Sequence, residues 1–431
     1  MRSNRVVAAI AMAATTAVVA AACGSSGSSS TGSGSNSSTG KVTITWWNNA
    51  TVGTLKPVWA HVTTAFNAAH PNITIRNINI QNEQFTTKIP LALQGSNPPG
   101  VYQQWGGGQE ATQVKSGKLL NLTPAVSSWI GQLGSAAAGW QVNGQQYGVP
   151  FDVHVVGFWY RTDLFATAGI TAPPKTLADL EADVTKLKAH HIVPIAVGSK
   201  DRWPDAFWWE YFALRECSTS VLKQAMSSIN MSAPCFAKAS SDLTAFMSTK
   251  PFQAGYLGTA AQQGAGSSAG LVANGKAAME LQGDWEPGTI AGLTSDKAIN
   301  SKLGWFGFPA VPGGAGDPTT VLGGGDGFSC TTSAPLAACA QFLQYLISPE
   351  VQKEVTAAGT GLPANPAAAS ALQGQGLKDA LAANQAAAYV QTYFDIAFPT
   401  QVGQNLDNAV ADFFAGQGSA QSVIGSVSGP A

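Results

Sequence analysis

Five short segments place tryptophan or glycine beside carboxylate and amide side chains, a combination that can recognise a polar ligand. The segments are 46–49 (Trp-Trp-Asn-Asn), 103–108 (Gln-Gln-Trp-Gly-Gly-Gly), 200–203 (Lys-Asp-Arg-Trp) with Trp208 and Trp209, 283–285 (Gly-Asp-Trp) and 323–326 (Gly-Gly-Gly-Asp). An aromatic ring can cover the apolar C–H face of a pyranose. Asp, Asn and Gln can each hold neighbouring hydroxyls. The pattern therefore indicates binding of a neutral, hydroxyl-rich solute.

A single Trp has a simpler explanation, because Trp is more often part of a hydrophobic core than of a ligand platform. We expect core positions for Trp59, Trp129, Trp140 and Trp305. The five segments differ from an isolated core Trp because each follows a predicted strand or begins a predicted helix. Those are the places where α/β proteins bind ligands.

Motifs that would indicate catalysis or a cofactor are weak. Residues 266–270 fit G-x-S-x-G without a preceding strand, and 270–276 resemble a phosphate-binding loop in which Ala277 replaces Ser or Thr. The chain has no C-x-x-C pair, and its His residues lack metal-ligand spacing. We therefore expect no enzyme activity, no cofactor and no metal. A glycosidase is an alternative, because the sequence does not show which carboxylates face each other.

Composition favours a large folded protein with a neutral partner. The chain has 431 residues, 45% of them hydrophobic, so more than one core is expected. Only 11% of the residues are charged and the net charge is -1, against about 25% charged residues in an average soluble protein. No basic patch is present, which argues against nucleic-acid binding.

The N-terminal residues are predicted to export and anchor the protein. Residues 1–22 carry two Arg and then an apolar stretch that is short for a membrane span, as in a secretory signal peptide. The small residues before Cys23 resemble a bacterial lipobox, which implies lipidation of that thiol. Residues 23–40 would then be the lipidated Cys and a disordered Gly/Ser tether. Cleavage without lipidation is the alternative. We expect a location on the extracellular face of the cytoplasmic membrane, with membrane contact through the lipid alone.

Four further cysteines fit an oxidising compartment. Local pairing of Cys217 with Cys235, and of Cys330 with Cys339, is the most economical arrangement. Each loop would contribute about 2–3 kcal/mol in the chain-entropy treatment. Free buried thiols are the alternative.

The order of predicted elements indicates an α/β fold. Strands are predicted at 42–47, 73–80, 100–105, 153–159, 192–197 and 277–281, and helices at 55–70, 85–94, 111–116, 177–190, 207–215, 240–248, 270–274, 334–348 and 349–357. Thr176 is the expected N-cap of the helix at 177–190. A third α/β stretch begins at 304–309, and the Ala-rich tail at 377–415 is predicted to be helical scaffold.

Several segments resemble the extracellular solute-binding proteins of family 1, the carbohydrate receptors of bacterial ABC importers. They include 159–165, 168–177, 274–279 followed by 283–285, 342–352 and 361–365. Within the family, actinobacterial receptors for xylobiose and related oligosaccharides are most similar, through 82–85, 104–108, 150–152, 203–211, 323–327 and 393–395. Asn48, Asn49 and His154 depart from that subgroup, so the sugar, its linkage and the affinity stay open.

The resemblance implies a two-lobed, type II periplasmic-binding-protein-like α/β fold with the ligand between the lobes. Lobe one is expected at 41–152 plus 302–361, and lobe two at 153–301 plus 362–431. Hinge closure would bury a neutral di- or oligosaccharide, and the closed monomer would deliver it to the ABC permease subunits. The expected ligand contacts are Asn48, Glu83, Trp105, Asp152, Trp203, Trp208, Asp284, Trp285, Gly325, Asp326 and Asp395. A receptor for a non-sugar solute, such as a polyol phosphate or a peptide, is the main alternative.

Overall fold

The computed structural model describes residues 40–427. The predicted signal peptide at 1–22, the lipidation of Cys23 and all but the last residue of the tether at 23–40 lie outside the described residues. These assignments therefore stay predictions. Within 40–427, no helix combines the length and the apolar character needed to cross a bilayer.

The first of two large β-sheets has the strand order β2-β1-β3-β12-β6. Its strands are β1 (Val42–Asn48), β2 (Ile73–Asn79), β3 (Val101–Gln104), β6 (Gly148–Pro150) and β12 (Gly327–Cys330). Strand β1 pairs in parallel with β2 and β3, as the alternation of strands and helices predicted. Strand β12 pairs antiparallel with β3 and β6, so a segment from late in the chain completes this sheet.

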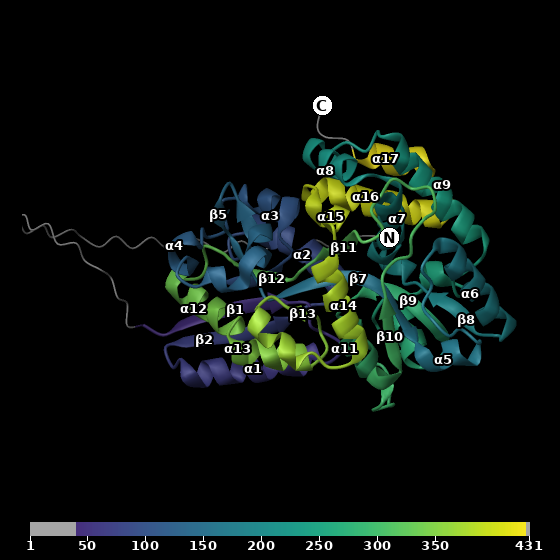
Figure 1. Cartoon of the computed structure of the whole chain (residues 1–431). Coiled ribbons are helices and arrows are strands. Elements are labelled where there is room, and N and C mark those ends of the chain that lie inside the picture. Colours follow the sequence, from purple (N-terminus) through teal and green to yellow (C-terminus); the bar gives the residue numbers. More distant parts are fainter. Residues whose placement is uncertain (1–39, 428–431) are drawn as a thin grey trace, which may run out of the picture. The chain divides into compact units, whose positions relative to one another are not determined.

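Contacts between aromatic rings hold the covering helices against the first sheet. These helices include α1 (Leu55–Ala69), α12 (Leu336–Leu346) and α13 (Pro349–Ala357), which Figure 1 shows beside β1 and β12. Trp46 on β1 is fully buried and meets Trp59, Phe328 and Phe342 edge-on, with ring centroids 5.1–5.3 Å apart. Trp59 is therefore in the core, as predicted.

The second sheet is built around one long strand. Its strands are β7 (Asp152–Arg161), β8 (Val193–Ala196), β9 (Ala277–Gly283), β10 (Leu303–Phe306), β11 (Val321–Gly324), β13 (Leu362–Pro363) and β14 (Val390–Thr392). Strand β7 pairs antiparallel with β9, β10, β11 and β13. The nearly continuous apolar run at 153–159 predicted a buried strand, and that prediction is confirmed because β7 has neighbours along both edges.

Helices surround the second sheet, some packed on its strands and others on those helices. They include α5 (Thr162–Thr167), α6 (Leu177–Ala189), α7 (Trp203–Glu216), α8 (Thr219–Ser228), α9 (Pro234–Ser248), α10 (Ser268–Ala273), α11 (Glu286–Gly292) and α17 (Ala420–Ser426). Thr176 caps α6 as predicted, since its side chain accepts a hydrogen bond from the Asp179 N–H in a capping box. Helix α7 is almost wholly buried, which makes it the centre of the largest hydrophobic cluster.

Shorter elements complete the fold. They are α2 (Asn82–Gln94), α3 (Gly107–Val114), α4 (Thr123–Val126), β4 (Gln141–Val142), β5 (Gln145–Gln146), and 3₁₀ segments at Ile130–Trp140, Ser199–Asp201, Tyr256–Gly258, Ile299–Lys302 and Pro366–Ala371.

The tail at 377–415 was predicted to be helical, and this is correct except at β14. The tail consists of α14 (Gln375–Ala386), the strand β14, α15 (Phe394–Ala397) and α16 (Thr400–Phe414). Strand β14 adds to the edge of β11 in parallel, and Pro399 separates α15 from α16 because Pro disfavours a helical residue before it. The break brings 393–408 next to the ligand segments described below.

The chain passes between the two sheets three times. It crosses at Pro150–Asp152, returns between Gly324 and Gly327, and crosses again before β13. The boundary expected at 302 does not fit this pairing, because β10 and β11 hydrogen-bond to the second sheet. We expected 302–324 in lobe one. The residues of a strand do not indicate which other strand it pairs with, so this expectation could not take the pairing with β7 into account. We propose that lobe two includes 302–324, and the other lobe boundaries stay proposals.

Both disulfides that local pairing predicted are present. Cys217 is bonded to Cys235, and Cys330 to Cys339. The first joins the end of α7 to the start of α9, and the second joins β12 to α12.

Candidate ligand-binding site

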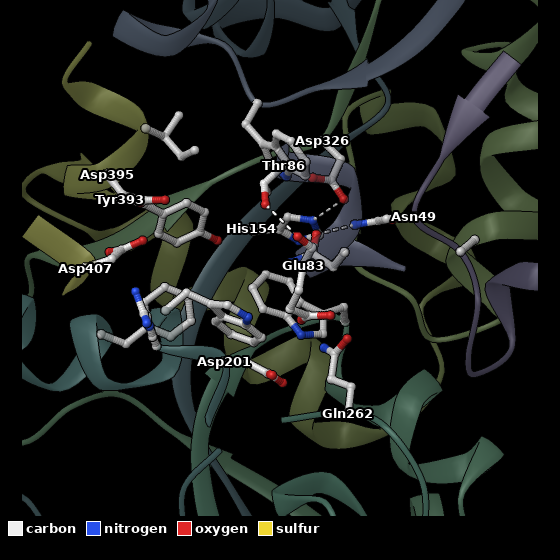
Figure 2. Close-up of a pocket in the computed structure, with 18 of the residues that line it drawn as sticks. Asn49, Glu83, Thr86, His154, Asp201, Gln262, Asp326, Tyr393, Asp395 and Asp407 are labelled. Carbon is white, nitrogen blue, oxygen red and sulfur yellow. Dashed lines mark hydrogen bonds and ion pairs between the residues drawn. The ribbon is translucent and has the colours of Figure 1, made fainter. Parts of the chain in front are cut away.

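A cavity of about 920 Å³ lies among segments that belong to both sheet systems. Residues following β1 and β3 and the first turns of α2 contribute from the first sheet. The start of α7, the turn after β9 and the α15–α16 region contribute from the second. Figure 2 shows Tyr393, Asp395 and Asp407 on one side of this space and Asn49 on the other, with His154 and Glu83 between them in the view.

Six of the eleven expected contact residues line the cavity. They are Glu83, Trp105, Trp203, Trp285, Asp326 and Asp395. Most of them follow directly on a strand or start a helix, and their role as ligand contacts stays a proposal. Gly283, at the end of β9, has no room for a side chain, because a Cβ there would collide with the Trp285 ring. A glycine at that position lets the indole fold back over the strand end.

The other five expected contacts do not line the cavity. Trp208 is fully buried in the core and stacks on Phe246, with ring centroids 5.3 Å apart. Gly325 lies close to the backbone of Asp152, where a side chain would clash. Asp152 and Asp284 are buried behind the cavity wall, where they contact His154.

Asn48 also faces away from the cavity, and Asn49 takes the expected position. The Asn48 Nδ2 donates to Asn77 Oδ1 at 2.7 Å, and its Oδ1 accepts from Asn79 Nδ2 at 2.7 Å. Asn49 lines the cavity and donates to Asn82 Oδ1 at 3.1 Å. Neighbouring side chains of an extended chain point to opposite sides, so the prediction missed the lining residue by one position.

An aromatic wall covers one side of the cavity. The indoles of Trp203 and Trp285 have centroids 6.3 Å apart at an interplanar angle of 66°. Phe207, one helical turn after Trp203, lies 5.3 Å from the Tyr393 ring and 6.4 Å from Trp285. Trp105 packs edge-on against Phe85 on the other side, 5.6 Å away. The rings present apolar faces at differing angles, as a ligand with several ring faces requires.

His154 is the centre of a buried charge cluster in the cavity wall. Its Nδ1 lies 2.7 Å from Asp284 Oδ1, and its Nε2 lies 3.1 Å from Asp152 Oδ1 and 3.5 Å from Asp326 Oδ2. Burial lowers the pKa of His154, but the negative charges of Asp152 and Asp284, with the hydrogen bond to Asp284, outweigh it and raise the pKa well above its usual value. Burial raises the pKa of Asp152 to about 7, with His154 opposing.

A second acidic group lies at the α15–α16 side of the cavity. Burial raises the pKa of Asp395 to about 6, and burial together with the charge of Asp395 raises the pKa of Asp407. Glu210 lies beneath them, fully buried, and its Oε1 accepts from the Phe394 N–H at 3.1 Å. Arg202 approaches from α7 and donates to Asn408. Burial therefore shifts the pKa of all three carboxyls toward the protonated form, in which a carboxyl can donate as well as accept a hydrogen bond.

Several buried polar atoms that line the cavity lack a hydrogen-bond partner within the described part of the chain. They are Glu83 Oε2, Gln109 Oε1, His154 Nε2, Trp203 Nε1, Trp285 Nε1, Tyr393 OH and Asp407 Oδ1. A buried polar group without a partner costs about 1–3 kcal/mol. Such groups are rare in folded proteins, so their concentration here indicates a site arranged for a polar ligand.

Sequence reasoning missed Asn49, Gln109, His154, Tyr393 and Asp407 as lining residues. Two signals were available for them. His154 is a polar residue within an apolar strand, and Tyr393 lies two residues from the expected contact Asp395. Asp407 gave no signal, because it lies on an amphipathic helix whose orientation only the fold sets.

The G-x-S-x-G match at 266–270 has a structural role. Ser267 caps α10, since its Oγ accepts from the Gly270 N–H at 3.0 Å and donates to the Gly264 carbonyl at 2.7 Å. Ser268 Oγ donates to the Ala261 carbonyl at 3.0 Å. Both hydroxyls are committed to backbone groups, as expected for a chance match.

Comparison with known proteins gives a family match. Residues 49–353 match the family described as bacterial extracellular solute-binding protein. An uncharacterised ABC transporter extracellular-binding protein of Pyrococcus horikoshii is 26% identical over 256 residues, which cover 56% of this chain and 55% of that protein. The diacetylchitobiose binding protein of Streptomyces coelicolor is 25% identical over 305 residues, 68% of this chain and 67% of that protein.

The fold also matches solved structures. One, from work on xylan utilization by the thermophilic bacterium Caldanaerobius polysaccharolyticus, has a TM-score of 0.82 and 24% identity over 89% of this chain and 98% of that chain. Such a match supports a two-lobed, type II solute-binding fold. The family and these relatives are binding proteins.

Proposed function

Because the chain belongs to the bacterial extracellular solute-binding protein family, we propose that it is the carbohydrate receptor of an ABC importer. Its ligand would be a neutral di- or oligosaccharide bound in the cavity between the two sheet systems. The observation that carries this proposal is the set of unpartnered buried polar atoms beside the aromatic wall of Trp203, Phe207 and Trp285.

Each part of that arrangement suits a sugar. Indole and phenyl faces can stack on the apolar faces of pyranose rings. The unpartnered indole N–H groups of Trp203 and Trp285 can donate to hydroxyls, and Glu83 and Asp407 can accept from them. Basic side chains in the cavity wall are few: Lys200 and Arg202 accompany five carboxylic acids. The wall is therefore poorly suited to a phosphate, which argues for a neutral solute.

Two of the comparisons are consistent with an oligosaccharide ligand, while another solved structure with the same fold comes from a receptor for β-D-galactopyranose, a monosaccharide. One curated relative is described as binding diacetylchitobiose, and one structural neighbour comes from work on xylan utilization. A xylobiose-like ligand is the specific form of the proposal. The cavity volume of about 920 Å³ leaves room for more than one sugar ring.

Transport would use hinge closure at the three chain crossings. The ligand would contact both sheet systems, and it must bind the closed form better than the open form to change the population. The closed monomer would then dock on the permease. A lipid on Cys23 would hold the protein at the extracellular face of the cytoplasmic membrane.

A thermal-shift screen of the chain from Lys41 onward tests the proposal. The panel contains xylobiose, cellobiose, maltose, trehalose and diacetylchitobiose, with an inorganic phosphate and a tripeptide as non-sugar controls. A ligand at one hundred times its Kd adds about 2.7 kcal/mol and raises the Tm by several degrees. One sugar that does so identifies the substrate class.

Three other outcomes would contradict parts of this proposal. A shift with phosphate or peptide and none with any sugar would contradict the carbohydrate assignment. Appearance of cleaved sugar during incubation would identify a glycoside hydrolase. A Trp285→Ala variant that shows the same sugar shift as the wild type would place the sugar outside this cavity.

A further inference from the structure

We propose that Asp152, His154 and Asp326 form a binding site for a first-row divalent metal ion, with Zn²⁺ as the probe. Residue spacing along the chain does not indicate this set, because the third residue lies 172 positions after the second. The fold brings the three side chains together in the cavity wall. The site's use in ligand binding rests on the proposed function, but metal binding itself does not.

The two spacings from His154 to the carboxylates fit a metal centre. His154 Nε2 lies 3.1 Å from Asp152 Oδ1 and 3.5 Å from Asp326 Oδ2, and one donor atom from each residue lies within 4.8 Å of the others. Zinc binds His nitrogen and carboxylate oxygen at about 2.0–2.2 Å. Two such ligands at a tetrahedral angle are about 3.3 Å apart, which lies between the two spacings observed.

The orientation of His154 also fits. Its Nδ1 hydrogen-bonds to Asp284 Oδ1 at 2.7 Å, so the N–H is held on that side and Nε2 is left for another partner. Nε2 is buried and has no aligned hydrogen bond among the described residues, although two carboxylates lie near it. A carboxylate behind a metal-binding His is the usual outer-shell arrangement of such sites. Asp284 is itself held by the backbone N–H groups of Val155 and Leu362.

Charge balance gives an independent reason. Asp152, Asp284 and Asp326 surround His154, and among the described residues no Lys or Arg forms an ion pair with any of them. A protonated imidazole can compensate one negative charge, whereas a divalent ion beside a neutral imidazole compensates two. Burying uncompensated carboxylates is costly, so this cluster favours a divalent cation.

The ion would face the ligand cavity. His154 and Asp326 line the cavity, and Asp152 lies behind them. Figure 2 shows His154 and Asp326 side by side at the end of the cavity near Asn49. Three protein ligands leave at least one coordination position open. A sugar hydroxyl could occupy that position, and the ion would then add to the aromatic and hydrogen-bonding contacts already described.

Metal titration of the full-length protein tests the site directly. Protein treated with EDTA and dialysed is titrated with ZnCl₂ by calorimetry near neutral pH, and bound metal is counted by elemental analysis. We expect one zinc ion per chain, with binding weakened more than about tenfold in Asp326→Asn. The matched control is Asp201→Asn, a cavity acid outside the cluster, which should bind zinc as the wild type does.

The variants separate loss of the site from loss of the fold. Asp326→Asn should disturb the fold less than His154→Gln, because the Asp326 side chain is 17% exposed. The Tm of this variant should therefore stay close to that of the wild type. His154→Gln should abolish zinc binding but can unfold the hinge, so its Tm is measured first. Absence of zinc binding by the wild type up to about 1 mM would overturn the proposal. Equal zinc binding by wild type and Asp326→Asn would do the same.

A sugar titration with and without EDTA distinguishes this proposal from the proposed function. Sugar binding without any zinc binding would overturn the metal site and leave the receptor function standing. Zinc binding that depends on Asp326 without binding of any sugar would support the metal site and contradict the receptor function.

Discussion

The Nδ1 of His154 lies 2.7 Å from the Oδ1 of Asp284, although the two residues are 130 positions apart in the chain. The same carboxylate accepts the N–H groups of Val155 at 3.3 Å and Leu362 at 2.7 Å. Asp284 is fully buried. One side chain therefore ties β7, the turn after β9, and β13 together, close to two of the three crossings between the sheets.

Replacing Asp284 with Ala should destabilise the protein strongly. The change removes the acceptor for three buried donors and leaves His154 without its partner. The expected loss in the free energy of unfolding is about 3–5 kcal/mol, as for other broken buried pairs, and urea denaturation measures it. Asp412→Ala, at an exposed position, is the control and should change stability by less than about 0.5 kcal/mol. A similar small change in both variants would refute the role assigned to Asp284.

Trp285→Ala should weaken sugar binding by about 2–4 kcal/mol, because a central aromatic anchor is lost. Calorimetric titration with the sugar found in the screen measures the effect. Trp208→Phe is the control, since Trp208 lies in the core and does not line the cavity. It should lower the Tm and leave the affinity unchanged. The assignment fails if Trp208→Phe weakens binding as much as Trp285→Ala does.

Tyr393→Phe separates ligand binding from stability. The Tyr393 hydroxyl is buried at the cavity and has no hydrogen-bond partner among the described residues. Removing it should leave the Tm unchanged or slightly raised. It should lower sugar affinity by about 0.5–1.5 kcal/mol if the hydroxyl bonds to the ligand. An unchanged affinity would show that the ligand does not reach Tyr393.

The stabilising contribution of Glu110 to the free energy of unfolding should decrease as the pH rises. This buried carboxyl has a pKa that burial raises to about 8, against 4.5 for a free Glu, with Ser329 opposing the shift. The folded state therefore holds the proton more tightly than the unfolded state. The contribution to stability is complete below about pH 4.5 and is lost as the pH rises to about 8.

Glu110→Gln should reduce that pH dependence. Urea unfolding at pH 5.5 and pH 8.5 gives the difference in stability for each protein. We expect the wild type to lose more stability than the variant, by an amount of the order of a few kcal/mol. Burial also raises the pKa values of Asp205 and Glu280, so part of the slope will remain in the variant. Identical slopes in both proteins would contradict the shift.

Removing the Cys217–Cys235 disulfide should cost stability without changing ligand affinity. The bond closes a loop with a sequence separation of 18, which gives about 3 kcal/mol in the chain-entropy treatment. The double Cys→Ser variant should therefore have a lower Tm. Trp203 and Phe207 line the cavity from the opposite end of α7, so calorimetry should find the wild-type affinity. A large loss of affinity would mean that the disulfide positions the aromatic wall.

Local sequence was sufficient for most elements. Strand β7 follows from its apolar run, and α6 from its Thr176 cap and helical periodicity. Both disulfides follow from short separations. Hydrogen bonds of helices and the alternation of strands are properties of neighbouring residues, so a linear pattern predicts them. The pairing of β10 and β11 with β7 is not local, so the linear pattern did not indicate which sheet these strands join.

Six of the residues that line the cavity were expected from the sequence, but the others depend on the packing of the fold. Trp203 and Phe207 share one face of α7 and line the cavity, whereas Trp208 lies on another face and enters the core. Helix α7 is buried on nearly all sides, so hydrophobic periodicity could not identify the ligand face. The cluster around His154 likewise combines residues that are far apart in the chain. The sequence by itself determined the elements and the chemical types available, because both depend on local composition. The tertiary structure decided which side chains meet, because only packing fixes the direction in which each element faces.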